Sequence, residues 1–456
     1  MKKLLIYLKE YRRECVLGPL FKLLEASFEL LVPLVMASVI DVGIAQRDQG
    51  YIIRMCLVLV ALGLIGLVCS ITAQYFAAKA SVGFAAKLRA MLYGHIQRLS
   101  YADMDTQGAS TLITRMTSDV NQVQNGMNLT LRLLLRSPFV VFGAMIMAFT
   151  IDWKAALIFV GVIPLLCVVV FGVMLWTMPR YKQVQSRLDK VLGLTRENLT
   201  GVRVVRAFGR EQAETAAFEA ENAGLTHLQE FVGKVSALMN PVTYIIINLG
   251  AVALIWAGAL RVDAGVITQG AVVALLNYMS QILVELVKLA NLIITITRAL
   301  ACANRVAAVP EIQPSLCSPE SAQAGTDAGV TFEDVSLTYR GAGAESLSGI
   351  RFAARPGETI GIIGGTGSGK SSLVNLIPRF YDVSGGRVLV GGVDVRDWPM
   401  EELRARVGVV PQKAELFTGT IRENLLWGKR DADDKELWQA LEQAQAKDFV
   451  EQKPKG

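Results

Sequence analysis

The chain has 456 residues, of which 52 % are apolar, and its mean hydropathy is +0.40. This is too long for one ordinary domain and too apolar for a typical soluble protein. The 46 Lys and Arg against 40 Asp and Glu are scattered, which excludes the clustered basic surface of a nucleic-acid-binding protein, so no nucleic-acid partner is expected. The six cysteines form no CxxC or Cys/His metal pattern, which indicates buried thiols in a reducing compartment.

Apolar runs predict six membrane spans. Crossing about 30 Å of hydrocarbon takes about 20 residues, and four charge-free runs reach that length: 55–78, 155–179, 235–260 and 264–284. Two further segments, 15–40 and 131–151, are apolar but carry charges. Buried helices of a soluble protein are the alternative, but such helices average only about 11 to 12 residues, which favours spans.

The charges of the first span lie on one helix face. Lys22, Glu25 and Glu29 are spaced i, i+3 and i+7. Because a charge facing lipid is costly, this face should point into the bundle. Two interpretations stay open: the face borders a cavity, or Lys22 pairs with Glu25 while Glu29 bonds to a neighbouring helix.

Basic residues near the span ends predict the orientation. The first thirteen residues hold five of them, whereas the connections after spans one, three and five hold few. We therefore expect a multi-pass protein of the cell inner (plasma) membrane with both termini in the cytoplasm. Residues 3–12 are interpreted as an interfacial helix, not as part of a signal peptide.

The two connections predicted on the cytoplasmic side, 79–130 and 180–234, are long, charged and rich in helix formers. Long loops without structure of their own are uncommon, so both should be helical arms that extend the spans by about 35 to 40 Å. The fold class is therefore an α-helical transmembrane domain with six spans and long cytoplasmic extensions.

The composition changes after the last span. Residues 310–329 are rich in Pro, Ser, Ala and Gly and are predicted to be a linker, which sets the domains at 1–309 and 330–456. The second domain begins with strand patterns at 330–339 and at 350–354. TIGII at 359–363 and VGVVP at 407–411 are predicted as short buried strands, RVLVGGVDV as a hairpin, and ELWQALEQAQA as a helix.

A phosphate-binding motif follows TIGII. The pattern GxxxxGK[ST] is formed by Gly364, Gly365, Thr366, Gly367, Ser368, Gly369, Lys370 and Ser371. In such a loop, glycines let backbone N–H groups approach phosphate oxygens, the lysine reaches the β and γ phosphates, and the hydroxyl binds Mg²⁺. The second domain is thus an α/β P-loop nucleotide-binding domain, with ATP and Mg²⁺ as its expected ligands.

Together these motifs resemble the ATP-binding cassette exporters, specifically a half-transporter of the multidrug type, over essentially the whole chain. VVPQKAELFTGTIRENL is similar to the family's glutamine loop, with Gln412 as its glutamine, and Tyr339 stands where the family stacks an aromatic ring on adenine. Segments 114–120 and 197–212 resemble the two cytoplasmic arms. Each also has a plainer interpretation: a strand aromatic, a polar loop residue, and solvated helices.

The resemblance implies a function and a set of partners. It predicts a dimer with a second half-transporter, identical or related, that couples ATP binding and hydrolysis to the export of a small, amphipathic molecule. It assigns Ser372 to the ATP site as well, Gln412 to catalysis, and Ser371 and Gln412 to Mg²⁺.

The family's signature, Walker B aspartate, catalytic glutamate and switch histidine do not follow Gln412 in this sequence. SGG at 384–386 lies upstream of Gln412 and is interpreted as a hairpin lead-in. We therefore expect the sequence to be truncated within the nucleotide-binding domain and inactive as an ATPase alone. The alternative function is a non-hydrolysing membrane protein that binds nucleotide or only a partner half.

Overall fold

The structure is a computed structural model that describes residues 2–319 and 329–453, and the chain forms two compact units, Met1–Ser315 and Leu316–Gly456. The first unit ends within the segment predicted as a linker. Residues 320–328 of that segment lie outside the described residues.

The first unit is helical in every part that the structure describes, apart from short turns. Its six longest stretches are apolar enough to cross a membrane, which confirms the predicted number of spans. They are Leu4–Ile44, Gln49–Ile96, Ala109–Ile151, Trp153–Thr200, Glu211–Asp263 and Gln269–Glu311.

Three of these stretches are single helices: α2 (Gln49–Ile96), α7 (Trp153–Thr200) and α9 (Glu211–Asp263). The other three are joined from shorter helices. The first contains η1 (Lys2–Tyr11), α1 (Arg12–Ser38) and η2 (Val39–Ile44), and the third contains α4 (Ala109–Thr114), η3 (Arg115–Asp119), α5 (Val120–Leu133) and α6 (Arg136–Ile151). The sixth contains α10 (Gln269–Ala308) and η4 (Val309–Glu311). The described part of the unit also contains the short helices α3 (Tyr101–Gln107) and α8 (Val202–Ala207).

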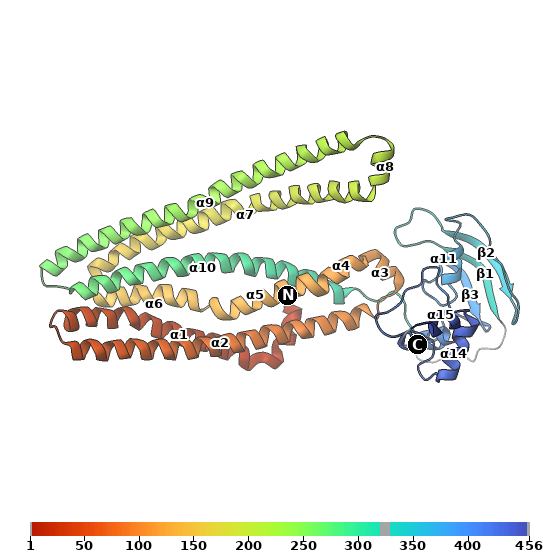
Figure 1. The fold of residues 1–456 in the computed structure, drawn as a ribbon, viewed down its shortest axis with the longest axis horizontal. Coiled ribbons are helices and arrows are strands. Elements are labelled where there is room, and N and C mark those ends of the chain that lie inside the picture. The colour runs from red at the N-terminus through yellow and green to blue at the C-terminus, as the bar shows by residue number, and fades with distance from the viewer. Residues whose placement is uncertain (1, 320–328, 454–456) are drawn as a thin grey trace. The chain divides into compact units, whose positions relative to one another are not determined.

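Both predicted arms are helical. The first consists of the end of α2, then α3, α4, η3 and α5, and the second of the ends of α7 and α9 joined by α8. Figure 1 shows α1 beside α2 and α7 beside α9, with α10 between these two pairs. The capping box of Ser100 and Asp103 begins α3 and turns the chain at the tip of the first arm.

The helices pack closely through small side chains. One core cluster of the bundle contains alanines with no exposed surface from α1, α6, α7 and α10: Ala26, Ala144, Ala148, Ala155, Ala156 and Ala274. Helices in lipid have no hydrophobic driving force for association, so they associate through close packing. Small side chains allow that close packing. Larger side chains fill the space between them, and the hydroxyl of Tyr278 donates to the carbonyl oxygen of Leu30 at 2.6 Å.

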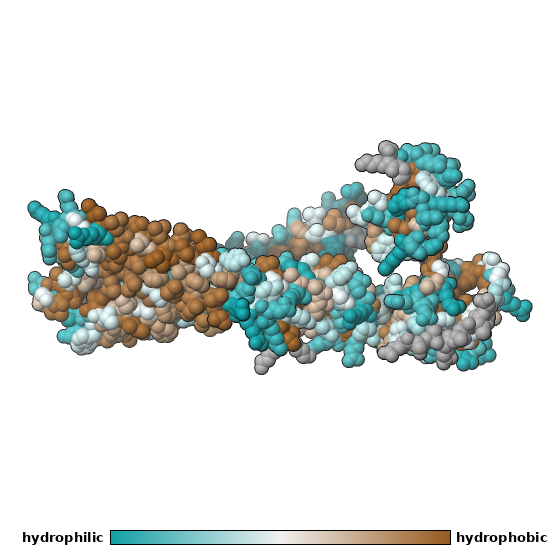
Figure 2. Space-filling view, turned by 90° about the horizontal axis from the view of Figure 1, so that it is seen from below, coloured by the Kyte–Doolittle hydropathy of each residue, from teal (hydrophilic) through white to brown (hydrophobic). Residues whose placement is uncertain are grey.

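One end of the helical unit is covered by exposed apolar side chains, which Figure 2 shows as a continuous brown surface. Exposed apolar side chains lie along three long helices of the unit: Ile53, Leu57, Val60, Leu64 and Val68 on α2, Leu157, Leu165, Val168 and Leu175 on α7, and Ile245, Leu249, Val252, Trp256 and Leu260 on α9. A soluble protein rarely exposes so much contiguous apolar surface, so this region is suited to lipid. The rest of the unit in this view is mostly hydrophilic.

The second unit contains an antiparallel sheet with the strand order β2-β1-β3-β4. The strands are β1 (Val330–Leu337), β2 (Leu347–Ala354), β3 (Gly385–Val390) and β4 (Val393–Asp394). The predicted hairpin is confirmed, because Gly391 and Gly392 link β3 to β4 at φ 60° and 78°, which only glycine adopts readily. Phe332, Val388 and Trp398 are fully buried in the core of this unit.

The described residues of this unit also form short helices: α11 (Lys370–Asn375), α12 (Met400–Arg406), α13 (Ile421–Leu425), α14 (Asp434–Gln443) and α15 (Lys447–Glu451). The helix predicted from ELWQALEQAQA is confirmed as α14.

Two predicted strands are wrong. Segments 359–363 and 407–411 join no sheet, and Ile363 and Val410 are each 96 % exposed. A strand is held by hydrogen bonds to a neighbouring strand, so an apolar run forms one only where a partner lies alongside. No strand that the structure describes lies alongside these two segments.

Candidate functional site

The phosphate-binding motif forms a loop that requires its glycines. Gly367 and Gly369 both have φ of 84°, in the left-handed region that other residues avoid. A Cβ atom at Gly369 would lie 2.8 Å from Leu347 Cδ2, and one at Gly364 would lie 2.7 Å from Ser368 Oγ. The sequence therefore adopts a conformation here that side chains at these positions would prevent.

Lys370 closes this loop upon itself. Its Nζ atom donates to the carbonyl oxygens of Gly364 at 2.8 Å and Gly365 at 2.6 Å, and to Ser368 Oγ at 3.2 Å. The loop is exposed, and a Cβ atom at Gly365 or Gly367 would meet nothing within 4 Å. An open, glycine-lined loop with an ammonium group in its centre fits the phosphates of a nucleotide.

Tyr339 lies next to this motif. Its hydroxyl donates to Ser372 Oγ at 2.8 Å, and its ring packs edge-on against Tyr381 with centroids 5.1 Å apart. The structure thus brings together an aromatic residue from the end of β1 and the helix α11 that carries Lys370 and Ser372. An aromatic ring and a phosphate loop are the two parts that an adenine nucleotide needs.

Gln412 makes no hydrogen bond to Tyr339 or to the phosphate loop. It lies in an exposed segment without helix or strand and makes no hydrogen bond with any residue that the structure describes. Ser371, the expected Mg²⁺ ligand, is exposed in the first turn of α11. The arrangement therefore supports phosphate binding by Lys370 and the glycines, while the roles of Ser371 and Gln412 at Mg²⁺ stay predictions.

A second polar site lies between the helices of the first unit. The buried guanidinium of Arg136 on α6 donates from Nη2 to Glu29 Oε2 on α1 and from Nη1 to Glu285 Oε1 on α10, each at 2.5 Å. Lys288 Nζ donates to Glu285 Oε1 at 2.9 Å, and Ser137 Oγ to Glu285 Oε2 at 2.8 Å. We call these five residues the Arg136 cluster.

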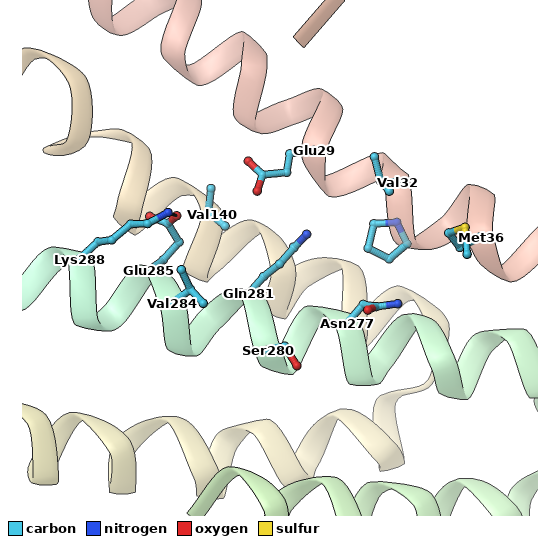
Figure 3. A pocket seen from close by; sticks show the side chains of 11 residues that line it. Glu29, Val32, Met36, Val140, Asn277, Ser280, Gln281, Val284, Glu285 and Lys288 are labelled. Carbon is cyan, nitrogen blue, oxygen red and sulfur yellow. Dashed lines mark hydrogen bonds and ion pairs between the residues drawn. The ribbon is translucent and has the colours of Figure 1, made fainter. Parts of the chain in front are cut away.

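The contacts of the first span agree with both interpretations of its charged face. Lys22 donates to both oxygens of Glu25, at 2.8 and 2.6 Å, and Glu29 bonds to a neighbouring helix, as the structural interpretation requires. Glu29 also lines a pocket of about 420 Å³, as the cavity interpretation requires. Figure 3 shows its carboxylate in the space between α1 and α10.

Sequence reasoning found Glu29 but missed Glu285 and Lys288. They follow directly after the charge-free run 264–284, so they fell outside the predicted span. Their i, i+3 spacing with opposite charge at the end of an apolar run was the available signal.

A third polar contact joins the first arm to the end of the unit. The buried carboxylate of Asp103 accepts hydrogen bonds from Ser100 Oγ at 2.7 Å and from the backbone N–H of Ser315 at 2.9 Å. Burial raises the pKa of Asp103, but these hydrogen bonds outweigh it and hold the pKa below its usual 3.8. His95 Nε2 lies 2.9 Å from the carbonyl oxygen of Ile312, so both Ile312 and Ser315 are hydrogen-bonded to the arm.

Comparison with known families covers both units. Residues 15–286 match the family model for the ABC transporter transmembrane region, and residues 347–456 match the ABC transporter model of the nucleotide-binding part. The first match spans the predicted membrane helices and the second includes the phosphate loop.

Similar proteins agree with these matches. An uncharacterized ABC transporter ATP-binding protein of Mycobacterium tuberculosis is 36 % identical over 452 residues, covering 98 % of this chain and 78 % of the relative. An ATP-dependent lipid A-core flippase of Chromobacterium violaceum is 28 % identical over 100 % of this chain and 78 % of its own length. A fatty acid ABC transporter ATP-binding/permease protein of Mycobacterium bovis is 30 % identical over 81 % of this chain and 58 % of its own length.

Six apolar helices that precede a glycine-lined phosphate loop, together with these matches over both units, show that the chain belongs to the ABC transporter family, as a half-transporter of the exporter type.

Proposed function

We propose that this chain couples ATP binding and hydrolysis to the export of a small amphipathic substrate, as one half of a dimer in the cell inner membrane. Residues 1–309 act as the membrane domain, 310–329 as the linker and 330–456 as part of the nucleotide-binding domain. Both termini lie in the cytoplasm, and Mg²⁺ accompanies ATP at Ser371 and Gln412.

One observation carries this proposal. The same chain holds six membrane-length helices and a phosphate loop whose lysine ammonium lies among Gly364, Gly365 and Ser368. A nucleotide can shift a membrane domain between two conformations only if the nucleotide binds to one conformation more tightly than to the other. A site of this kind attached to a helical bundle therefore suits a nucleotide-driven transporter.

The relatives support an amphipathic substrate. One is named for lipid A-core and another for fatty acid, and both molecules have polar and apolar parts. An exposed apolar surface on the bundle and a polar pocket within it suit a molecule of that type.

We further propose that the 456-residue chain alone hydrolyses no ATP. Hydrolysis requires a second carboxylate at Mg²⁺ and a group that positions water, and neither motif follows Gln412 in this sequence.

The test is nucleotide binding and turnover by the purified chain in detergent. Photolabelling with an azido-ATP should occur in the parent and be lost in Lys370→Ala. Lys429→Ala is the matched control, because Lys429 is an exposed lysine of the same unit that pairs with Glu436 outside both the phosphate loop and the glutamine loop. Labelling that survives in Lys370→Ala would refute the site, and Lys370-dependent ATP turnover by this chain would refute the proposed inactivity.

A further inference from the structure

The pocket between α1, α6 and α10 has both polar and apolar walls. Val32, Pro33 and Met36 of α1 and Val140 of α6 supply apolar surface. Polar residues of α10 line the other side: Asn277, Ser280, Gln281, Glu285 and Lys288. Figure 3 shows the side chains of Glu29 and Gln281 in the space between the two helices. A mixed lining of this kind suits an amphiphile more than a purely apolar molecule.

The charges of the Arg136 cluster balance. Glu29 and Glu285 are opposed by Arg136 and Lys288, so the cluster is neutral. A ligand of net charge entering this pocket would leave an uncompensated charge in a region of low dielectric constant, which is costly. A ligand without net charge avoids this cost.

One carboxylate oxygen of the pocket lacks a partner among the described residues. Glu29 Oε1 accepts no hydrogen bond from a described residue, and the Glu29 side chain is 40 % exposed. Gln281 Oε1 also has no partner, but it is fully buried and so is closed to a ligand in the pocket. The carboxylate of Glu29 therefore suits an ammonium group, which offers three donors.

A donor is available on the α10 side of the same pocket. Lys288 gives one hydrogen bond to Glu285, and its side chain is 43 % exposed, so its ammonium group retains donors for an anion. Glu29 lines the pocket from α1 and Lys288 lines it from α10. The pocket therefore offers an acceptor on one wall and a donor on another.

We propose that this pocket binds the head group of a zwitterionic amphiphile. Its ammonium group binds Glu29 Oε1, its anionic group binds Lys288, and its apolar chain contacts Val32, Pro33 and Met36. This inference rests on the proposed export function, because it names the class of substrate that the membrane domain takes. A simple cation would face Lys288, and a simple anion would face Glu29, so neither matches both charged walls.

The test measures ligand binding without nucleotide, so that it can fail independently of the ATP site. The purified chain in detergent is unfolded by heat over a range of concentrations of dihexanoyl phosphatidylethanolamine, since a ligand of the folded state raises Tm by an amount that grows with the logarithm of its concentration over its Kd. Dihexanoyl phosphatidylglycerol has the same chains but an anionic head group. Free phosphoethanolamine has the head group alone. We expect the apparent affinity for the first lipid to exceed that for each of the others by about tenfold or more.

Variants assign the effect to the pocket. Glu29→Gln and Lys288→Gln should each weaken the binding of the phosphatidylethanolamine by about tenfold, the usual scale for losing a charged contact. Ser280→Phe should abolish binding by filling the pocket without changing the ion pairs, and it keeps the test valid if Glu29→Gln fails to fold. Glu230→Gln and Lys234→Gln are matched controls, because they break an exposed pair on α9. Lys370→Ala should bind the lipid like the parent even where it has lost ATP.

Equal shifts with phosphatidylethanolamine and phosphatidylglycerol would overturn the zwitterion assignment. A shift that persists in both Glu29→Gln and Ser280→Phe would overturn the pocket. Free phosphoethanolamine binding as tightly as the lipid would overturn the amphiphile assignment in favour of a water-soluble zwitterion.

Discussion

The two units of this protein satisfy their backbone hydrogen bonds in different ways. In the first unit the apolar runs are helices, whose N–H and C=O groups bond to residues four positions away. In the second unit the sheet forms between β1, β2 and β3, but the apolar runs 359–363 and 407–411 have no partner strand. A helix forms its backbone hydrogen bonds within one segment, whereas a strand forms them with a second segment elsewhere in the chain.

Ion pairs differ in burial as well. The side chains of Arg136 and Glu285 are 7 % and 3 % exposed, inside a bundle that is covered by apolar residues. In the second unit Arg351 and Asp334 pair at 72 % and 62 % exposure. Buried pairs are costly to break and exposed pairs contribute little, so substitutions in the Arg136 cluster should cost much more than substitutions at exposed pairs of either unit.

The largest expected effect is that of Arg136→Met. The substitution leaves Glu29 and Glu285 without their shared partner in a buried site, which should lower the free energy of unfolding by about 3 to 5 kcal/mol. Thermal unfolding in detergent, followed by circular dichroism, measures the loss. Arg187→Met is the matched control, since it breaks the exposed pair with Glu221 and should cost at most about 1 kcal/mol. Equal losses in the two variants would contradict the contrast between buried and exposed pairs.

An intermediate effect is expected for Asp103→Asn. Weakening the hydrogen bonds from Ser100 and Ser315 to this buried carboxylate should cost about 1 to 3 kcal/mol. Asp189→Asn, which changes an exposed aspartate on α7, should change little.

The lowered pKa of Asp103 predicts how the stability of the fold depends on pH. The pKa of Asp103 is lower in the folded state than its usual 3.8, so its contribution is complete above pH 3.8 and is lost as the pH falls toward the folded pKa. Thermal unfolding between pH 6 and pH 3 should therefore show a steeper loss in the parent than in Asp103→Asn. Parallel pH profiles would show that this carboxylate is not stabilised by folding.

The smallest effect is expected for Val410→Ser. Because this side chain is 96 % exposed, removing its apolar surface should change the free energy of unfolding of the second unit by less than about 0.5 kcal/mol. The control is Val388→Ser, a fully buried strand position, where losing packing and burying a hydroxyl should cost about 2 kcal/mol or more. A large loss from Val410→Ser would mean that segment 407–411 packs against something that this structure does not contain.

The features that could be predicted from sequence depend on neighbouring residues. Span number, the helical arms, the hairpin at Gly391 and Gly392 and the helix α14 all follow from local periodicity or turn chemistry. The phosphate loop follows from eight consecutive residues. These patterns need no information about the rest of the chain.

The features that could not be predicted depend on distant residues. The partners of Arg136 lie 107 and 149 positions away, and Ser315 lies 212 positions from Asp103. The prediction of strands at 359–363 and 407–411 was wrong for the same reason, because an apolar run does not show which segment will pair with it. The place of Gln412 relative to Lys370 also depends on such pairing.

The length of α2 has a mechanical consequence. This helix runs without proline for 48 residues and connects the tip of the first arm to the region where Lys22 contacts Ser70. It is a rod about 70 Å long at 1.5 Å per residue, so a tilt of about 5° at one end displaces the other end by about 6 Å. The helix therefore acts as a lever that turns a small rotation of the arm into a shift comparable to the width of a side chain. The displacement of any point on α2 during such a tilt depends on the distance of that point from the pivot.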